Sequence, residues 1–385
     1  MTPAPDNKTS ETACSGGGRR RSLSLQMPCA VVAGALLGQM VALPKSAQLL
    51  LAANGEAGRV IVDMADRKVT VPEQIHRAGC FEVLCYDKLF LLGGRGLVAT
   101  MLRTDPPWMS TIDPNVARIP KVETEAPNRE QVLADGIDIV FLRYNRLLLR
   151  GLESTGIPAV VSQPPLDTHF EDAVAFGNAQ KRMVRLFGSI IGGAAVQKAE
   201  EWCAYFDERI QYVMKRVADV PQAKRPRAYY LRGPNATQTQ GPGTNTYWYG
   251  RIAGADMISS DLPFNSQGPM SMEEILRRDP VFIFVGRQYS PGLVLNDARW
   301  RDVGAVKNHR VIALPDGLFY WDGSTEGVLL AELMAKTLYP DRFGDLDVPG
   351  EVRRYYKRFY GYEFTDDALA KFMRGLTPAG IRRGY

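Results

Sequence analysis

The feature that most constrains the fold is a stretch of about 40 residues without proline between two similar segments of chain. It runs from Phe176 to Val217, and its apolar residues recur at helical spacing. This pattern predicts one long linker helix, residues 176–218, with Gly192-Gly193 as the place where it can bend. At roughly 100 to 200 residues per domain, a chain of 385 residues has room for a lobe on each side.

Both flanking segments alternate short apolar runs with helical patterns. Apolar runs without alternation indicate parallel strands that are covered on both faces. The expected strands are 77–81, 137–142 and 158–161 in the N-terminal lobe, residues 58–175, and 227–231, 281–285 and 311–314 in the C-terminal lobe, residues 219–385. The expected helices are 82–92, 129–135 and 272–278, followed by closing helices over 325–338 and 349–374. The predicted fold class is therefore α/β, with two Rossmann-like lobes.

Residues 1–57 have the pattern of a signal peptide and its cleavage region. Three arginines, 19–21, precede the charge-free run from Ser22 to Leu43. Arg20-Arg21-Ser22-Leu23 is similar to a twin-arginine signal. We therefore expect export, cleavage near residues 54–58, and a periplasmic protein.

Three cysteines follow the predicted signal region: Cys80, Cys85 and Cys203. An oxidising compartment permits a disulfide between Cys80 and Cys85, and leaves Cys203 as an odd thiol that we expect to be buried. A soft-metal site at the first two cysteines is the less favoured alternative, because there is no second pair.

The composition argues against several other classes of protein. Forty-seven basic and 42 acidic residues give a net charge of +5, too small for nucleic acid to be the main partner. No P-loop, G-x-S-x-G or H-E-x-x-H motif is found, so no catalytic residue is predicted and we expect a protein that is not an enzyme. The histidines are His76, His169 and His309, too few to predict a metal site.

Several short motifs carry a resemblance to a known family. They are Val69 to Pro72, Gly156 to Val160, Tyr249 to Ala255, Trp300 to Val311, Leu338 to Pro340 and Phe359 to Gly361. In this order, on an exported chain with two lobes, the sequence resembles the periplasmic substrate-binding proteins of ABC importers for iron-siderophores, haem and cobalamin. The resemblance implies a monomer without a cofactor, a ligand cleft between the lobes, and an inner-membrane permease as partner.

In that family one glutamate at the tip of each lobe docks the permease. The matching segments here are Asn128 to Leu133 and Ser271 to Leu276, which nominates Glu130 and Glu273. The simpler interpretation is that both glutamates favour the positive end of a helix dipole. Ser271 and Glu274 also form a capping-box pattern by themselves.

Ligands of such lobes lie beyond the carboxyl ends of the strands, so the loops there should face the cleft. The candidate ligand-binding residues in these loops are Tyr86, Arg103, Trp108, Arg143, Tyr144, Arg232, Tyr247, Trp248, Arg287, Tyr289, Tyr320 and Trp321. Aromatic rings and guanidinium groups suit a large, flat or anionic ligand, although ordinary packing explains any single ring as well.

The resemblance favours an iron-siderophore or a similar metal chelate as the ligand. Cobalamin, haem, a directly bound metal and a molybdate-type oxyanion stay open, and tyrosine ligation of ferric iron is a further alternative. An exported metalloenzyme is the less favoured alternative from another class of protein, because nitrogenase components share the topology of two lobes.

Overall fold

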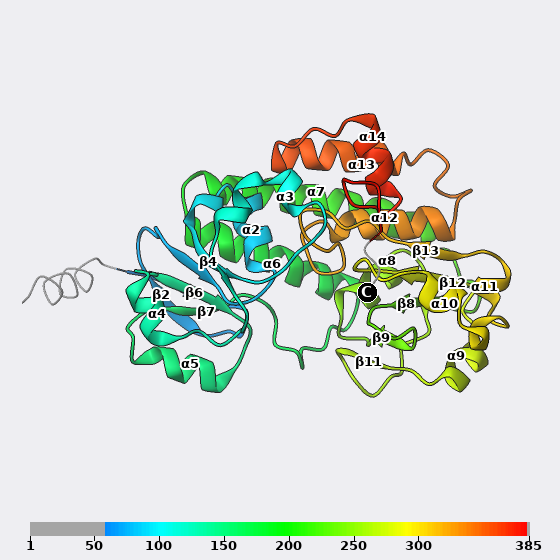
Figure 1. The fold of residues 1–385 in the computed structure, drawn as a ribbon, viewed down its shortest axis with the longest axis horizontal. Helices are drawn as coiled ribbons and strands as arrows, with labels where there is room; N and C mark the ends of the chain where they lie inside the picture. The colour runs from blue at the N-terminus through cyan, green and yellow to red at the C-terminus, as the bar shows by residue number, and fades with distance from the viewer. Residues whose placement is uncertain (1–57, 383–385) are drawn as a thin grey trace, which may run out of the picture. The chain divides into compact units, whose positions relative to one another are not determined.

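A computed structural model describes residues 58–382 of the chain (Figure 1). The predicted signal region and its cleavage site lie outside these described residues. None of the helices between residues 58 and 382 combines the length and apolar character that crossing a bilayer requires. The described part begins with an antiparallel hairpin of β1 (Arg59–Val62) and β2 (Lys68–Val71), as the alternating sequence there suggests.

The N-terminal lobe is built on a parallel sheet with the strand order β5-β4-β3-β6-β7. All four residues of the central strand β6 are buried, as expected for a strand that is covered on both faces. The strands are β3 (Ala78–Cys80), β4 (Val98–Leu102), β5 (Lys121–Val122), β6 (Ile139–Leu142) and β7 (Ala159–Val161). The helices are α2 (Cys85–Leu91), α3 (Met109–Ile112), α4 (Arg129–Ala134) and α5 (Arg146–Glu153).

The C-terminal lobe has a second parallel sheet, with the order β10-β8-β12-β13. β9 and β11 form a separate antiparallel pair; in the chain β9 comes after β8, and β11 comes after β10. The strands are β8 (Arg227–Leu231), β9 (Gln238–Gln240), β10 (Asp256–Met257), β11 (Gln267–Pro269), β12 (Phe282–Val285) and β13 (Val311–Ala313). The helices before β13 are α8 (Asn245–Ile252), α9 (Met272–Arg278), α10 (Gly292–Leu295) and α11 (Gly304–Lys307). The α/β class with two parallel-sheet lobes is thus confirmed.

The segment between the lobes is helical, as predicted, but it folds back on itself. It consists of α6 (Ala173–Ile191) and α7 (Ala194–Val217), which break at Gly192-Gly193. Both glycines have positive φ, 76° and 53°, a conformation that side chains with a Cβ rarely adopt. A Cβ on Gly188 would lie 2.8 Å from that of Ala199, so the two helices pack closely. The glycine pair therefore reverses the chain instead of only bending it.

Helix α6 touches both lobes. Near its start, the ring of Phe176 stacks on Trp248 of α8 with a centroid distance of 6.1 Å. Towards its end, Phe187 stacks on Phe141 of β6 at 4.5 Å. One helix thus contributes to the core of each lobe.

The C-terminal helices form a second connection between the lobes. They are α12 (Gly327–Leu338), α13 (Val348–Tyr355), the π-helical turn η5 (Tyr356–Tyr360) and α14 (Asp366–Met373). Trp108 of the N-terminal lobe packs against Phe372 of α14, and its Nε1 donates to the Leu376 carbonyl at 2.8 Å. Asp87 of α2 accepts from Thr325 through both the backbone nitrogen, at 2.9 Å, and Oγ1, at 2.8 Å.

The disulfide that the sequence left open is present. Cys80 at the end of β3 is bonded to Cys85 at the start of α2, and the free thiol of Cys203 is buried. Burial raises the pKa of Cys203 to about 11, so this thiol stays protonated near neutral pH. The disulfide closes the loop that leads from the first strand of the sheet into its first helix.

Candidate ligand site

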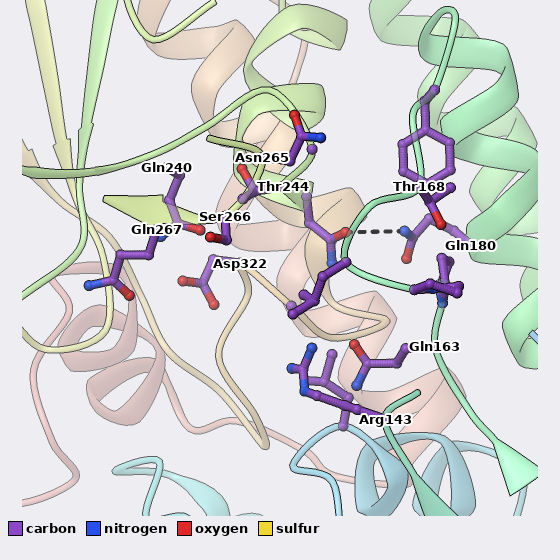
Figure 2. A pocket seen from close by; sticks show the side chains of 18 of the residues that line it. Arg143, Gln163, Thr168, Gln180, Gln240, Thr244, Asn265, Ser266, Gln267 and Asp322 are labelled. Atoms are coloured by element: carbon purple, nitrogen blue, oxygen red, sulfur yellow. Dashed lines mark hydrogen bonds between the residues drawn. The ribbon is translucent and has the colours of Figure 1, made fainter. Parts of the chain in front are cut away.

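A polar cavity of about 170 Å³ lies at the carboxyl ends of the parallel strands, between loops of the two lobes (Figure 2). The N-terminal lobe lines it with Arg143 after β6 and Gln163 after β7. The C-terminal lobe contributes Arg232 after β8 and Arg287 after β12, with Asp322 between them. This is the place where ligands bind in open α/β sheets.

The two arginines of the C-terminal lobe are held by one buried carboxylate. Arg287 Nε donates to both oxygens of Asp322 at 2.8 Å, and Arg232 Nε lies 2.7 Å from Oδ2. The Asp322 side chain is only 2% exposed. Two positive charges thus share a single negative partner, which leaves one net positive charge at this wall. We name Arg232, Arg287 and Asp322 the arginine cradle.

Burial and charge act against each other in the arginine cradle. Burial disfavours the charge of Arg287, but Asp322 outweighs it and the pKa of Arg287 is raised. For Arg232, burial lowers the pKa in spite of Asp322, and the neighbouring charge of Arg287 adds to the lowering. A guanidinium group nevertheless stays protonated in proteins. A ligand anion would supply the second negative charge that the cradle lacks.

A second buried acid lies behind the arginine cradle. Asp316 accepts a hydrogen bond at 3.0 Å from Nε2 of Gln288, the residue that follows Arg287. Burial raises the pKa of Asp316 to about 7, and the charge of Asp322 adds to the rise. The cradle therefore lies beside a carboxyl group that changes its charge near neutral pH.

Neutral donors complete the cavity wall. Gln180 of α6 donates to the Asn245 side chain at 3.3 Å, across the space between α6 and the start of α8 (Figure 2). Gln240 is 3% exposed, and its Nε2 has no partner among the described residues. A buried amide donor without a partner is costly unless something in the cavity accepts from it. This group therefore suits a ligand with acceptor oxygens.

In the N-terminal lobe the cationic group is held more loosely. Arg143 Nε lies 3.7 Å from Glu125 Oε1, and the Glu125 side chain is 50% exposed. Such an exposed pair contributes little free energy. Arg143 can therefore turn towards a ligand at little cost.

The structure brings together three of the four predicted arginines, Arg143, Arg232 and Arg287, which all line the cavity. Most of the predicted aromatic residues lie elsewhere. Tyr86, Trp108 and Trp321 are buried in the core, and Tyr247 and Trp248 line a separate hollow beside the end of α7. Arg103 is paired with Glu123, and the side chains of Tyr144 and His169 are exposed. Tyr289 and Tyr320 do not line the cavity. The ring of Tyr320 nevertheless lies 4.6 Å from the Arg287 guanidinium. Ligand contacts by these residues stay predictions.

Sequence reasoning missed the neutral amides of the cavity, among them Gln163, Gln180 and Gln240. Gln163 and Gln240 lie at or just after the end of a strand, so the rule that selected the arginines also reaches them. Gln180 gave no such signal, because it lies within a helix. Among residues 58–382, no group of three or more histidine, cysteine, aspartate or glutamate side chains is placed to hold a metal ion.

The two predicted docking glutamates are both exposed, each in the first turn of its helix. Neither Glu130 nor Glu273 has a hydrogen bond or an ion pair to another described residue. Glu274, in contrast, is bonded to Arg277 and Arg278, and these bonds lower its pKa to about 2. The structure thus separates a paired glutamate from its unpaired neighbour, as the capping-box argument suggested.

Comparison with known proteins agrees with this architecture. The family model of periplasmic binding proteins matches residues 152–318. The molybdate-binding protein MolA of Haemophilus influenzae is 26% identical over 339 residues, which cover 82% of this chain and 94% of that protein. Its structure with bound molybdate has a TM-score of 0.71 at 23% identity, covering 80% of this chain and 99% of that one.

Two further solved structures share the fold. A periplasmic solute-binding protein from Veillonella parvula has a TM-score of 0.68 at 22% identity, covering 82% of this chain and 97% of that one. A protein of an ABC-type Fe³⁺-hydroxamate transport system from Saccharomonospora viridis has a TM-score of 0.58 at 18% identity, covering 73% and 98%. The resemblance to periplasmic binding proteins of ABC transporters is confirmed. The family model describes periplasmic binding proteins, and the similar structures are described as binding proteins or as part of a transport system.

Proposed function

We propose that this protein captures a small oxyanion of the molybdate type and delivers it to an ABC importer of the inner membrane. The arginine cradle carries the proposal, because it holds two partly buried guanidinium groups on one buried carboxylate and faces Arg143 across the cavity. With Asp322 ionised, these four side chains carry a net charge of +2. Guanidinium forks match the oxygens of an oxyanion, and the amide of Gln240 can donate to the same ligand.

The size of the cavity supports a small ligand. Pockets for drug-sized organic molecules have volumes of about 300–1,000 Å³, whereas this cavity has about 170 Å³. A tetrahedral anion needs no more room than a few water molecules. MolA, which resembles this chain over most of its length, is described as a molybdate-binding protein, and this similarity points in the same direction.

An anionic metal chelate such as an iron-siderophore is the second candidate. The same three arginines can bind carboxylate or catecholate oxygens, and the related protein of an Fe³⁺-hydroxamate transport system has this fold. The chelate would require the lobes to separate further, since its volume exceeds that of the cavity. Cobalamin and haem are larger still.

The two candidates can be separated by calorimetry on the purified protein. Molybdate, tungstate, sulfate, phosphate and a set of ferric siderophores would be titrated in turn. We expect saturable binding of at least one tetrahedral oxyanion with a micromolar or lower Kd. Binding of a siderophore without any oxyanion would reject our first candidate and favour the second.

For delivery we propose that the protein, acting as a monomer, docks its permease through Glu130 and Glu273. Both carboxylates are exposed and unpaired within the described residues, and are thus available to arginines of a partner. Replacing both with alanine should abolish uptake and leave ligand affinity unchanged. The matched control is Glu208→Ala with Glu153→Ala, two exposed glutamates outside the predicted docking segments. Normal uptake by the Glu130/Glu273 double variant would reject the docking assignment.

A further inference from the structure

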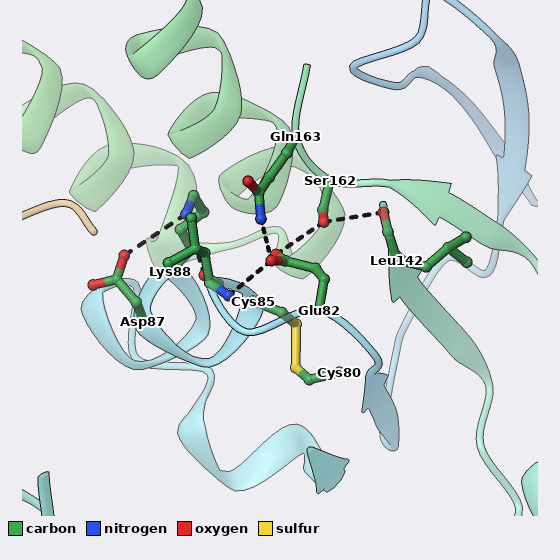
Figure 3. Close-up of a disulfide and its surroundings, with 9 residues drawn as sticks. Cys80, Glu82, Cys85, Asp87, Lys88, Leu142, Ser162 and Gln163 are labelled. Carbon is green, nitrogen blue, oxygen red and sulfur yellow. Dashed lines mark hydrogen bonds and ion pairs between the residues drawn. A yellow bond between two sulfur atoms is a disulfide. The ribbon is translucent and has the colours of Figure 1, made fainter. Parts of the chain in front are cut away.

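Gln163 has a fixed orientation at the cavity wall. It is 8% exposed, and its Nε2 donates to the carboxylate of Glu82 (Figure 3). The amide nitrogen thus has a partner, whereas no hydrogen bond to the amide oxygen is found among the described residues. Figure 2 shows the amide group of Gln163 facing the guanidinium group of Arg143.

Glu82 itself is held by its own partners. It is 1% exposed, and accepts from Ser162 Oγ at 3.0 Å and from the backbone nitrogen of Leu84 at 2.7 Å. The loop that carries it is closed by the disulfide between Cys80 and Cys85 (Figure 3). Every contact of the carboxylate comes from a donor, so Glu82 can act only as an acceptor for the Gln163 amide.

Gln163 and Arg143 line the same cavity, and they follow neighbouring strands. Leu142 of β6 pairs with Val161 of β7, so Ser162 lies beside Arg143 at the carboxyl edge of the sheet and Gln163 lies one residue further along. A guanidinium group only donates hydrogen bonds, and an amide oxygen accepts them. The fixed oxygen of Gln163 is therefore suited to hold the one arginine that the N-terminal lobe contributes to the cavity.

We propose that Glu82 and Gln163 are positioning residues, which aim the Arg143 guanidinium at the ligand. Glu82 fixes the amide of Gln163, and the amide oxygen of Gln163 accepts from Arg143 when the guanidinium group leaves Glu125 and turns into the cavity. We call this set of contacts, from Glu82 through Gln163 to Arg143, the relay. The loop closed by the disulfide holds Glu82 in place. The relay rests on the proposed function in one respect only, namely that Arg143 binds the ligand.

The orientation of Arg143 can be tested without a ligand. In ¹⁵N-labelled protein, the Nε–H signal of Arg143 is identified by its loss in Arg143→Met. Gln163→Met, which keeps the volume of the side chain, and Glu82→Met should both shift this signal. Glu82→Gln keeps an acceptor oxygen for Gln163 and should leave the signal unchanged. A signal that does not move in Gln163→Met would overturn the relay, whatever the protein binds.

Ligand affinity gives the second test, with molybdate and any other anion that the wild-type protein binds as the probes. Gln163→Met and Glu82→Met should each weaken binding about tenfold, while Glu82→Gln stays within about threefold of the wild type. In an Arg143→Met background, Gln163→Met should add less than about threefold, because residues that act through one another are not additive. Gln74→Met, an exposed glutamine outside the cavity, is the matched control.

The outcomes separate this inference from the proposed function. If no oxyanion binds the wild-type protein, the proposed function fails, and the Nε–H signal still decides the relay. If an oxyanion binds but Gln163→Met weakens it equally with and without Arg143, Gln163 acts on the ligand directly and the relay is rejected. Loss of affinity in Glu82→Gln would show that the charge of Glu82 matters rather than its hydrogen bonds, and would also reject it.

Discussion

The two lobes supply positive charge to the cavity in different ways. The C-terminal lobe holds Arg232 and Arg287 on the buried carboxylate of Asp322, at 2.7 and 2.8 Å. The N-terminal lobe supplies Arg143, whose acidic neighbour is exposed and 3.7 Å away. A buried pair is costly to break, whereas an exposed pair contributes little. One wall is therefore organised before the ligand arrives, and the other can adjust to it.

This division has an energetic reason. Fixing every group in advance would require burying a third positive charge without a partner, which is unfavourable. Leaving all groups mobile would require the ligand to order them, at a cost of about 0.5–1.5 kcal/mol for each side chain. A fixed wall opposite an adjustable one limits both costs.

Asp322→Ala should have the largest effect on the difference between the two lobes, because it removes the carboxylate that holds Arg232 and Arg287. It leaves two partly buried guanidinium groups, 20% and 22% exposed, without a counter-charge. Removing one partner of a fully buried pair typically costs about 3–5 kcal/mol. Because water reaches these arginines, we expect a somewhat smaller loss in the free energy of unfolding, measured by denaturant titration. Asp297→Ala is the control, since Asp297 pairs with the exposed Arg299. Equal stability of the two variants would contradict the account of the arginine cradle.

The acid behind the cradle predicts a dependence of stability on pH. Because the pKa of Asp316 is about 7 in the folded protein and about 4 in the unfolded chain, its protonated form stabilises the fold. That contribution is complete below pH 4 and is lost as the pH rises through 7. Relative to Asp316→Asn, the wild type should lose on the order of 3 kcal/mol of stability between pH 4 and 8. Parallel pH profiles of the two proteins would exclude this role.

Removing the disulfide tests the rigid base of the N-terminal wall. For a loop of about six residues, chain entropy predicts a loss of about 2 kcal/mol in the double variant Cys80→Ala with Cys85→Ala. Cys203→Ala, which removes a buried free thiol, controls for lost packing. We also expect weaker ligand binding in the double variant, measured by calorimetry, because Glu82 and Leu84 belong to the same loop. Unchanged affinity at reduced stability would separate the loop from the cavity.

The smallest effect should distinguish the arginines of the two walls. A hydrogen bond to a charged group contributes about 1.5–3 kcal/mol, so Arg287→Met should weaken binding by about tenfold or more. Arg143→Met should cost less, because the guanidinium group must first be ordered. Since Arg143 is the more exposed, its contribution should also fall more steeply as salt is added. A larger loss in Arg143→Met would reverse the roles of the two lobes.

Much of the fold was predictable, because it depends on local patterns. Buried parallel strands such as β6 and β12 read as uninterrupted apolar runs, and Ser271 does cap α9 by accepting from Glu274 N at 3.1 Å. The reversal at Gly192-Gly193 was harder to foresee. Two glycines allow either a bend or a turn, and the choice depends on packing between α6 and α7.

The candidate site was predictable in part for the same reason. Arg143, Arg232 and Arg287 follow strand ends at the edge of a sheet that faces the cavity. Arg103 also follows a strand, β4, but it pairs with Glu123 and does not line the cavity, so the position after a strand is not sufficient by itself. Trp108 and Trp321 occupy similar positions in sequence, but their rings pack on Phe372 of α14. No local pattern shows that Phe372, more than 50 residues further along the chain, covers them. The ring-rich segment 247–249 likewise proved to be part of helix α8, which buries its rings.

The two connections between the lobes also bear on the mechanics of capture. A single flexible linker would allow a wide hinge motion between the lobes. Here two separate connections link them: the hairpin of α6 and α7, and the contacts of Asp87 and Trp108 with the C-terminal segment. Together they permit a small rotation of one lobe relative to the other and oppose a large one. Ligand-free and ligand-bound forms should therefore differ little in radius of gyration.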